Sequence, residues 1–155
     1  MNFTPEFIWV SDAHSAARLI NKWHEDYPHR IPATEELINK YVKYVRNSYP
    51  DVLNIQLLDI NKQVGFDGEW RKVDVRIGYD RPPHWREVPE LMERLEKNFK
   101  LYPKDSEDKY EALKEWYRQL ETIHPFRDGN GRTGGIMVAA ISKFYSVNKY
   151  MAPLQ

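Results

Sequence analysis

Apolar residues recur at intervals of three or four along most of this chain, which is the spacing of amphipathic helices. Ser11 or Asp12 can cap the first helix, and Thr34 can cap the second. The pattern predicts helices over residues 12–27, 34–50, 89–99 and 105–123, followed by an almost wholly apolar helix around 136–144. A helix that is apolar nearly all round is expected at the centre of a domain.

The period of the pattern changes between Trp70 and Ile77. Val73, Val75 and Ile77 alternate with charged residues, which predicts a strand that forms half of a hairpin. Residues 52–60 fit either a strand or a short helix. The expected fold class is therefore all-α, with one small β-hairpin.

Length and charge narrow the class of protein. The 155 residues are expected to form a single domain over residues 1–155. The 23 basic and 23 acidic residues cancel, so neither nucleic acid nor a membrane is an expected partner. There is no cysteine, which excludes thiolate nucleophiles and cysteine-bound zinc. The longest apolar run, from Ile136 to Ile141, is too short to span a bilayer, and no signal peptide is predicted, so a cytoplasmic protein is expected.

The string HPFRDGNGRTGG, at positions 124–135, concentrates glycines and hydrogen-bonding residues between two predicted helices. Gly129, Asn130 and Gly131 would present backbone N–H groups at the positive end of the following helix, where phosphates bind. Arg132 adds a permanently charged fork that suits phosphate oxygens. These four residues are predicted to bind the phosphates of a nucleotide.

Two further residues of the string could carry chemistry. Asp128 adjoins the glycine turn, where a carboxylate would repel a phosphate unless a cation such as Mg²⁺ lay between them. His124 could act as a general base. Together with the phosphate site, these residues predict phosphoryl or nucleotidyl transfer. Taken singly, Asp128 could equally be a turn residue, and His124 a surface or core histidine.

Other sites are less well supported. GNGRTG satisfies a dinucleotide-binding pattern, but a helix rather than a strand is predicted before it, and no acidic residue follows about 20 positions later. A Walker loop is excluded because no Gly-Lys-Ser/Thr closes the pattern. Zinc binding by His14, His24 and His29 is a remote alternative, because no two of them share a helical face well.

The residues HPFRDGNGR resemble the signature of the Fic family, in which two variable positions and a second arginine follow. The segment from Gly68 to Leu95 is also similar to the flap hairpin of that family and the helix after it. The resemblance covers roughly residues 68–145 and implies a mainly helical Fic-like fold.

The resemblance also implies an activity, the transfer of AMP from ATP to a Ser, Thr or Tyr hydroxyl of a target protein. His124 would deprotonate that hydroxyl, and Asp128 would hold Mg²⁺. The backbone from Gly129 to Gly131 and the Asn130 side chain would hold the α-phosphate, and Arg132 would contact the β-phosphate.

Further roles follow from the same resemblance. Phe126 would be structural. The flap, with Val73, Val75 and Ile77, would receive the target as an added strand, so that main-chain hydrogen bonds align its hydroxyl. The alternative for these three residues is a half-buried strand that packs on the domain.

The chain departs from the family pattern at Gly135, which stands where the second arginine would contact the γ-phosphate. Such a contact contributes about 1.5–3 kcal/mol, and no local feature favours glycine there. A different donor, a degenerate member or an engineered substitution would each explain the change. Transfer of UMP, phosphocholine or phosphate therefore stays open, as does a catalytically silent binding module.

The family's inhibitory Ser/Thr-x-x-x-Glu-Gly/Asn string does not occur in this sequence. Regulation would therefore come from a separate antitoxin-like inhibitor protein or be lacking.

Overall fold

Helices make up most of the described part of the chain. The computed structural model describes residues 6–22, 31–48, 52–99, 108–146 and 149–153. The elements, in chain order, are β1 (Phe7–Val10), α1 (Ala13–Lys22), α2 (Glu35–Ser48), α3 (Leu53–Gln63), the 3-10 turn η1 (Trp85–Glu87), α4 (Val88–Asn98), α5 (Asp108–Ile123), α6 (Asn130–Tyr145) and β2 (Tyr150–Pro153). The expected class, mainly helical with a small two-stranded antiparallel element, is confirmed.

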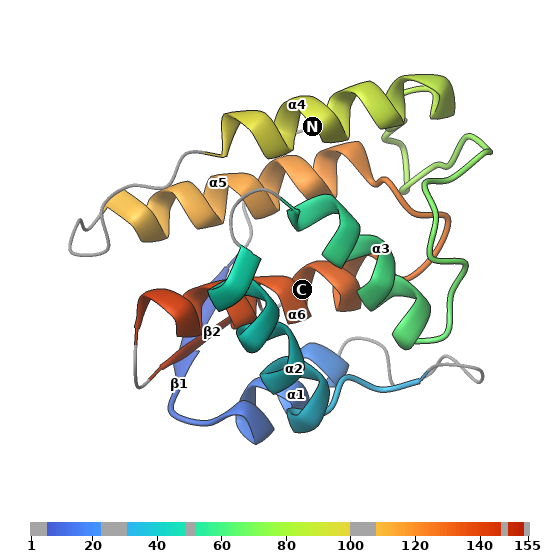
Figure 1. Cartoon of the computed structure of the whole chain (residues 1–155). Helices are drawn as coiled ribbons and strands as arrows, with labels where there is room; N and C mark the ends of the chain where they lie inside the picture. The colour runs from blue at the N-terminus through green and yellow to red at the C-terminus, as the bar shows by residue number, and fades with distance from the viewer. Residues whose placement is uncertain (1–5, 23–30, 49–51, 100–107, 147–148, 154–155) are drawn as a thin grey trace.

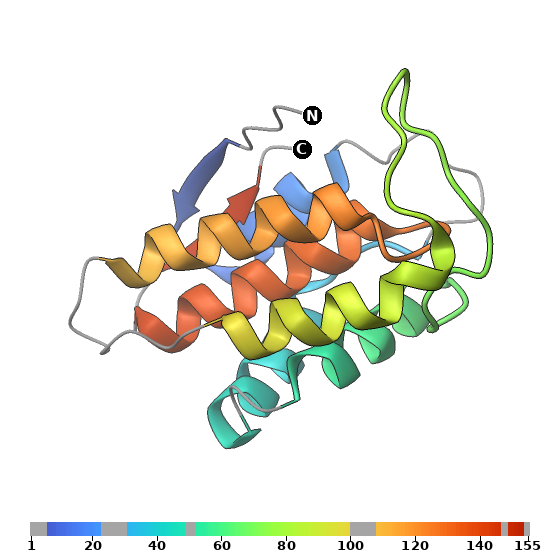
Figure 2. The same cartoon turned by 90° about the horizontal axis from the view of Figure 1, so that it is seen from above.

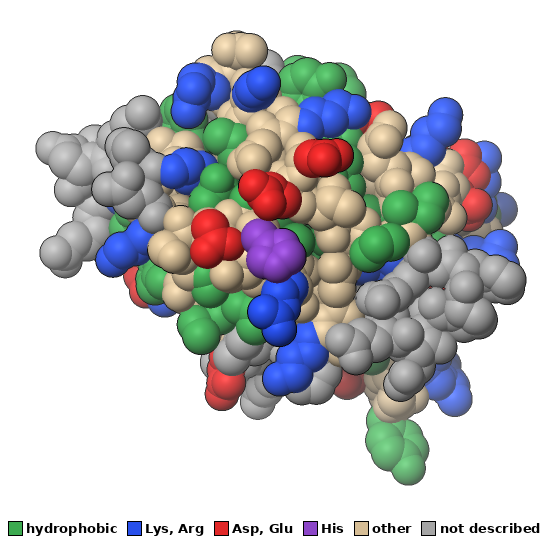
Figure 3. Space-filling model, turned by 90° about the horizontal axis from the view of Figure 1, so that it is seen from below, with side chains coloured by type: hydrophobic (Ala, Val, Ile, Leu, Met, Phe, Trp, Pro, Cys, Tyr) green, Lys and Arg blue, Asp and Glu red, His purple; other side chains and the backbone are tan. Residues whose placement is uncertain are grey.

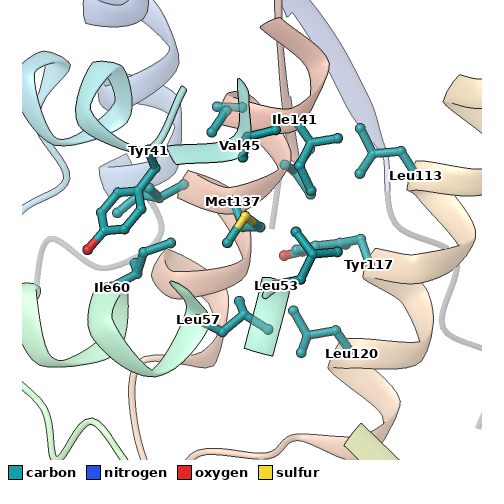
Figure 4. Close-up of a cluster of buried hydrophobic side chains, with 14 of the residues drawn as sticks. Tyr41, Val45, Leu53, Leu57, Ile60, Leu113, Tyr117, Leu120, Met137 and Ile141 are labelled. Carbon is teal, nitrogen blue, oxygen red and sulfur yellow. The ribbon is translucent and has the colours of Figure 1, made fainter. Parts of the chain in front are cut away.

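Helix α6 lies at the centre of the fold and contacts α1, α2, α3, α5 and β2 (Figure 1). Helices α4 and α5 pack against each other, and both lie above α6 in Figure 1. Seen from above, the axes of the three helices are roughly aligned (Figure 2). Met137 of α6 lies amid side chains from α2, α3 and α5, including Tyr41, Leu57 and Tyr117 (Figure 4). The prediction of a central apolar helix is therefore confirmed.

Several helix boundaries follow from local sequence. The Asp12 carboxylate accepts a hydrogen bond from the Ser15 backbone at 2.7 Å, and the Thr34 hydroxyl accepts one from the Leu37 backbone at 3.1 Å, as the capping predictions require. Pro89 occupies the first turn of α4. Residues 52–60, which fitted a strand or a helix, lie almost wholly in α3. Residues 23–27, 49–50 and 105–107 of three predicted helices lie outside the described residues.

The two-stranded sheet pairs the segments near the two ends of the chain. Strands β1 and β2 are antiparallel, with Phe7 opposite Pro153 and Val10 opposite Tyr150. The Met151 backbone donates a hydrogen bond to the Ser142 hydroxyl at 2.7 Å, which anchors β2 to α6. The sheet therefore joins residues far apart in sequence, which periodicity could not predict.

The strand predicted from Trp70 to Ile77 is wrong. This segment belongs to a long loop whose only strand-like pairing is one bridge, in which Ile77 and Asp80 exchange backbone hydrogen bonds of 2.9 and 3.0 Å. Gly78 (φ 60°) forms the turn between them. The alternation of apolar and charged residues was real, but in the described part of the chain no strand lies beside this segment to complete a ladder.

Figure 3 shows the lower face of the molecule, where acidic side chains gather beside a histidine near the centre and basic side chains lie around them. No patch of a single charge covers this face. Among the described residues, no helix combines the length and the apolar character needed to cross a bilayer.

Candidate functional site

The HPFRDGNGR string forms the connection between α5, which ends at Ile123, and α6, which begins at Asn130. The Asn130 side chain closes this loop, because its Oδ1 accepts a hydrogen bond from the Phe126 backbone at 2.9 Å and its Nδ2 donates to the Phe126 carbonyl at 2.8 Å. Phe126 is buried and lies 5.3 Å from the Trp70 ring. The side chain expected to hold an α-phosphate is thus engaged in shaping the loop.

The start of α6 provides the backbone geometry of an anion site. The first helical hydrogen bond runs from the Thr133 N–H to the Gly129 carbonyl, so the N–H groups of residues 130–132 have no partner within the helix. Gly129 precedes them with φ 82°, and a Cβ atom there would stand 2.3 Å from the Phe66 ring. Glycine is required at 129 on both counts.

Phe66 and Ile31 cover the arginine of the string. The Arg132 side chain is 2% exposed, its Nη1 donates to the Ile31 carbonyl at 3.1 Å, and its guanidinium lies 4.9 Å from the Phe66 ring centre. A phosphate could reach this fork only if Phe66 or Ile31 moved. The structure therefore brings Arg132 to the helix start but covers it.

His124 has a strained backbone at the end of α5. Its φ of 51° makes it the one non-glycine residue with positive φ among those described. Its Nδ1 is buried. Burial, reinforced by the nearby Arg71 charge, lowers the pKa of His124 to about 4, against the opposing effects of the Glu121 backbone and the Asp128 carboxylate. The imidazole is therefore neutral at physiological pH, as a proton acceptor must be.

Asp128 lies at the rim of a small polar recess. Its side chain is 63% exposed, and its nearest ion-pair partner is Arg127, at 4.0 Å. Asp67 and Glu69 also line the recess, which has a volume of about 140 Å³. Among the described residues, no group of three or more His, Asp or Glu side chains could hold a metal by itself. A cation at Asp128 would need oxygen ligands from phosphate and water, which is the usual coordination of Mg²⁺.

Asn61 of α3 ties three parts of the site together, and sequence reasoning missed it. Its Nδ2 donates to the Asp128 carbonyl at 3.0 Å and to the Thr133 hydroxyl at 3.2 Å. Its Oδ1 accepts a hydrogen bond from the Gly68 backbone at 3.0 Å. In the sequence, the one sign of its role was its place as a polar residue beside Leu57 and Ile60 on the apolar face of a helix. That face is buried in the structure.

The loop between Arg71 and Pro83 carries the residues that were predicted to bind a target. Val73 is 46% exposed, whereas Val75 and Ile77 are half-buried. A recess of about 340 Å³ lies beside them, lined in part by Arg76, Arg81 and His84. The loop is thus accessible, although it presents one bridge and not a strand edge.

Gly135 lies where α1 packs on α6. A Cβ atom on Gly135 would stand 3.1 and 3.3 Å from two carbons of the Ile20 side chain. No local feature of the sequence favours glycine at 135, but the tertiary structure supplies a long-range one, the close approach of the Ile20 side chain of α1.

A family model described as Fic/DOC family matches residues 48–142, from the end of α2 into α6. The match covers more than half of the chain. It includes the loop from His124 to Gly129, as well as Asn61 and the residues from Arg71 to Pro83.

Proposed function

The chain belongs to the Fic/DOC family, whose members are generally transferases, and we propose that it transfers AMP from ATP to a hydroxyl of a target protein. One observation carries this proposal. The backbone of Phe126, two residues after His124, is bonded through both polar atoms of the Asn130 side chain to the start of α6. These bonds hold a neutral imidazole and the N–H groups of the first turn of α6 at the same end of the domain.

In the proposed reaction, the His124 imidazole takes the proton of a Ser, Thr or Tyr hydroxyl. The hydroxyl oxygen forms a bond to the α-phosphorus of ATP, and the bond from that phosphorus to the oxygen bridging to the β-phosphate breaks. Pyrophosphate leaves, and AMP remains on the target. The pKa of about 4 at His124 makes the imidazole a weak base, but one that is already deprotonated at neutral pH.

The phosphates would lie against the N–H groups of residues 130–132, which stabilise negative charge at a helix N-terminus. Arg132 would join them once Phe66 moved aside, because the Phe66 ring lies over its guanidinium. The same movement would enlarge the recess at Asp128, whose present volume of about 140 Å³ is below the roughly 300–1,000 Å³ of a typical ligand pocket. The exposed Asp128 carboxylate would hold Mg²⁺, whose charge would neutralise phosphate oxygens.

The target segment would lie along the exposed loop between Arg71 and Pro83. Val73 and the recess beside Arg76 and Arg81 are accessible there. The bridge between Ile77 and Asp80 leaves most of the loop backbone without a strand partner, so a target could supply one.

The test is to incubate the purified protein with labelled ATP, Mg²⁺ and a cell lysate. We expect a labelled protein band, and an intact mass of the labelled target increased by one AMP moiety. Label should disappear with His124→Ala and persist with His14→Ala, an exposed histidine on α1. Label that persists in His124→Ala would exclude His124 as the base, and a different added mass would identify another transferred group, such as UMP, phosphocholine or phosphate.

A catalytically silent binding module is the second candidate, and the covered state of Arg132 favours it. Calorimetric titration of ATP–Mg²⁺ into the wild type and Phe66→Ala separates the two. An enzyme should bind nucleotide in both forms. Binding that requires Phe66→Ala, together with no labelled band, would support a module whose anion site is closed.

A further inference from the structure

Arg71 is a charged residue whose side chain is fully buried at the base of the exposed loop. Its Nε donates to the His124 carbonyl at 2.8 Å, and its Nη2 donates to the Ile123 carbonyl at 3.3 Å. Its own backbone N–H donates to the Pro125 carbonyl at 2.9 Å. Arg71 is thus bonded to three consecutive residues at the end of α5.

The same guanidinium holds both ends of the exposed loop. Its Nη1 donates to the Val73 carbonyl at 2.9 Å, and its Nη2 donates to the Pro83 carbonyl at 2.5 Å. The Asp74 carboxylate lies 3.9 Å from Nη1 and is the carboxylate paired with it. Arg71 therefore uses most of the N–H groups of its planar guanidinium on backbone carbonyls. A lysine ammonium could not donate hydrogen bonds in all of these directions.

The hydrogen bonds of Arg71 surround His124, whose backbone conformation is unfavourable. His124 has a φ of 51°, a conformation that residues with a Cβ atom rarely adopt. The carbonyls at the end of a helix lack intrahelical partners, and Arg71 supplies donors to two of them. A conformation of this kind persists when the surroundings fix it from several directions.

We propose that Arg71 is a positioning residue, which fixes the backbone of His124 and joins it to the loop from Val73 to Pro83. Movement of the loop is then transmitted to the histidine through one guanidinium. Arg71 touches neither nucleotide nor target in this role. Its charge also contributes to the lowered pKa of His124.

The importance of this arrangement for catalysis rests on the proposed function, whereas the arrangement itself can be tested without it. Arg71→Gln removes the charge and most of the donors, and Arg71→Lys keeps the charge but loses the fork. Arg94→Gln makes the same charge change at an exposed position of α4, away from the site, and serves as the matched control. The pKa of His124 is measured by NMR titration of its ring protons in each variant.

We expect the pKa of His124 to rise above about 4 in Arg71→Gln, because one nearby positive charge is removed, and to stay near the wild-type value in Arg71→Lys and Arg94→Gln. In the AMP-transfer assay, kcat should fall roughly 10- to 100-fold in both Arg71 variants, because the base is no longer held in place. The KM for ATP should change by less than about twofold, because the N–H groups of α6 are untouched. If Arg71→Gln fails to fold, the kcat of Arg71→Lys tests the proposal, and a wild-type kcat in that variant overturns it.

A folded Arg71→Gln whose His124 pKa and kcat match those of Arg94→Gln would overturn the proposal. So would losses of kcat of the same size in all three variants, the control included, with no change in the pKa of His124, because such losses would not be specific to Arg71. If the wild type transferred no group at all, the proposed function would fail, and a raised pKa of His124 in Arg71→Gln would still support the positioning role.

Discussion

The Ile20 side chain of α1 lies 3.1 Å from the point where a Cβ atom on Gly135 of α6 would stand. This contact changes the interpretation of the departure from the Fic pattern. An arginine at 135 would point into the interface between α1 and α6, where Ile20 and Ala16 are buried. The glycine is thus part of a packed interface, whatever its effect on nucleotide binding.

Gly135→Arg should lower the free energy of unfolding by about 1–3 kcal/mol, because it forces a large side chain into a filled interface. Ile20→Ala opens space at the same place. The double variant should therefore lose less stability than the sum of the two single changes, as measured by urea unfolding of all four proteins. Strictly additive losses would show that Ile20 does not oppose the arginine.

The rate of AMP transfer should respond to pH through His124. Its pKa of about 4 means that the base is neutral above that pH, so the rate should show no histidine step between about pH 5.5 and 8. The rate should fall as pH drops through about 4, where the imidazole gains a proton. A pH–rate profile of kcat/KM on the wild type, restricted to the range in which circular dichroism shows a folded protein, checks this. A midpoint near 6.5 would mean that the ring is solvated.

Glu121 should make the free energy of unfolding fall as pH rises, whereas a carboxylate in an ion pair makes it rise. Burial raises the pKa of Glu121 to about 7, above the ordinary value of 4.5, so the folded state binds more protons than the unfolded state between these values. Stability should therefore fall as pH rises from about 4.5 to 7. The fall from this group is on the order of 2 kcal/mol.

Glu121→Gln tests this contribution by removing the titration. The variant should be more stable than the wild type at pH 8 and show a smaller difference at pH 5, as measured by urea unfolding at both values. Glu111→Gln, at an exposed position on the same helix, is the control. An equal effect of Glu121→Gln at the two pH values would argue against a buried carboxyl.

Asn61→Ala should destabilise the protein, because it leaves buried partners in the loop and in α6 without their hydrogen bonds. A buried polar group left unsatisfied costs about 1–3 kcal/mol. Thermal unfolding compared with that of Asn47→Ala, an exposed position on α2, measures the loss. A loss no larger than in the control would mean that Asn61 does not support the site.

Asp128→Ala should separate metal binding from folding. The exposed carboxylate makes no close contact, so the free energy of unfolding should change by less than about 0.5 kcal/mol. The dependence of AMP transfer on Mg²⁺ concentration should be weakened or lost, and chelation of Mg²⁺ by EDTA should reproduce the loss in the wild type. Unchanged Mg²⁺ dependence in the variant would place the metal elsewhere.

The sequence alone determined those features that depend on near neighbours. The caps at Asp12 and Thr34 and the start of α4 at Pro89 follow from bonds and backbone angles within one turn. The run from Ile136 to Ile141 predicted the central helix because its faces are apolar all round. The string from His124 to Arg132 predicted a site at a helix start, because unpaired N–H groups there are a property of any helix.

The tertiary structure decided the features that depend on residues far apart along the chain. The alternation after Trp70 could not reveal that neither of the described strands, β1 and β2, pairs with it, because strand pairing is a property of two segments. Asn61 and Arg71 act on the loop after α5 from more than 50 positions away, and Ile20 accounts for Gly135 only once α1 lies on α6. Local periodicity reports the preference of a segment for a conformation, whereas these contacts arise only when the whole chain has packed.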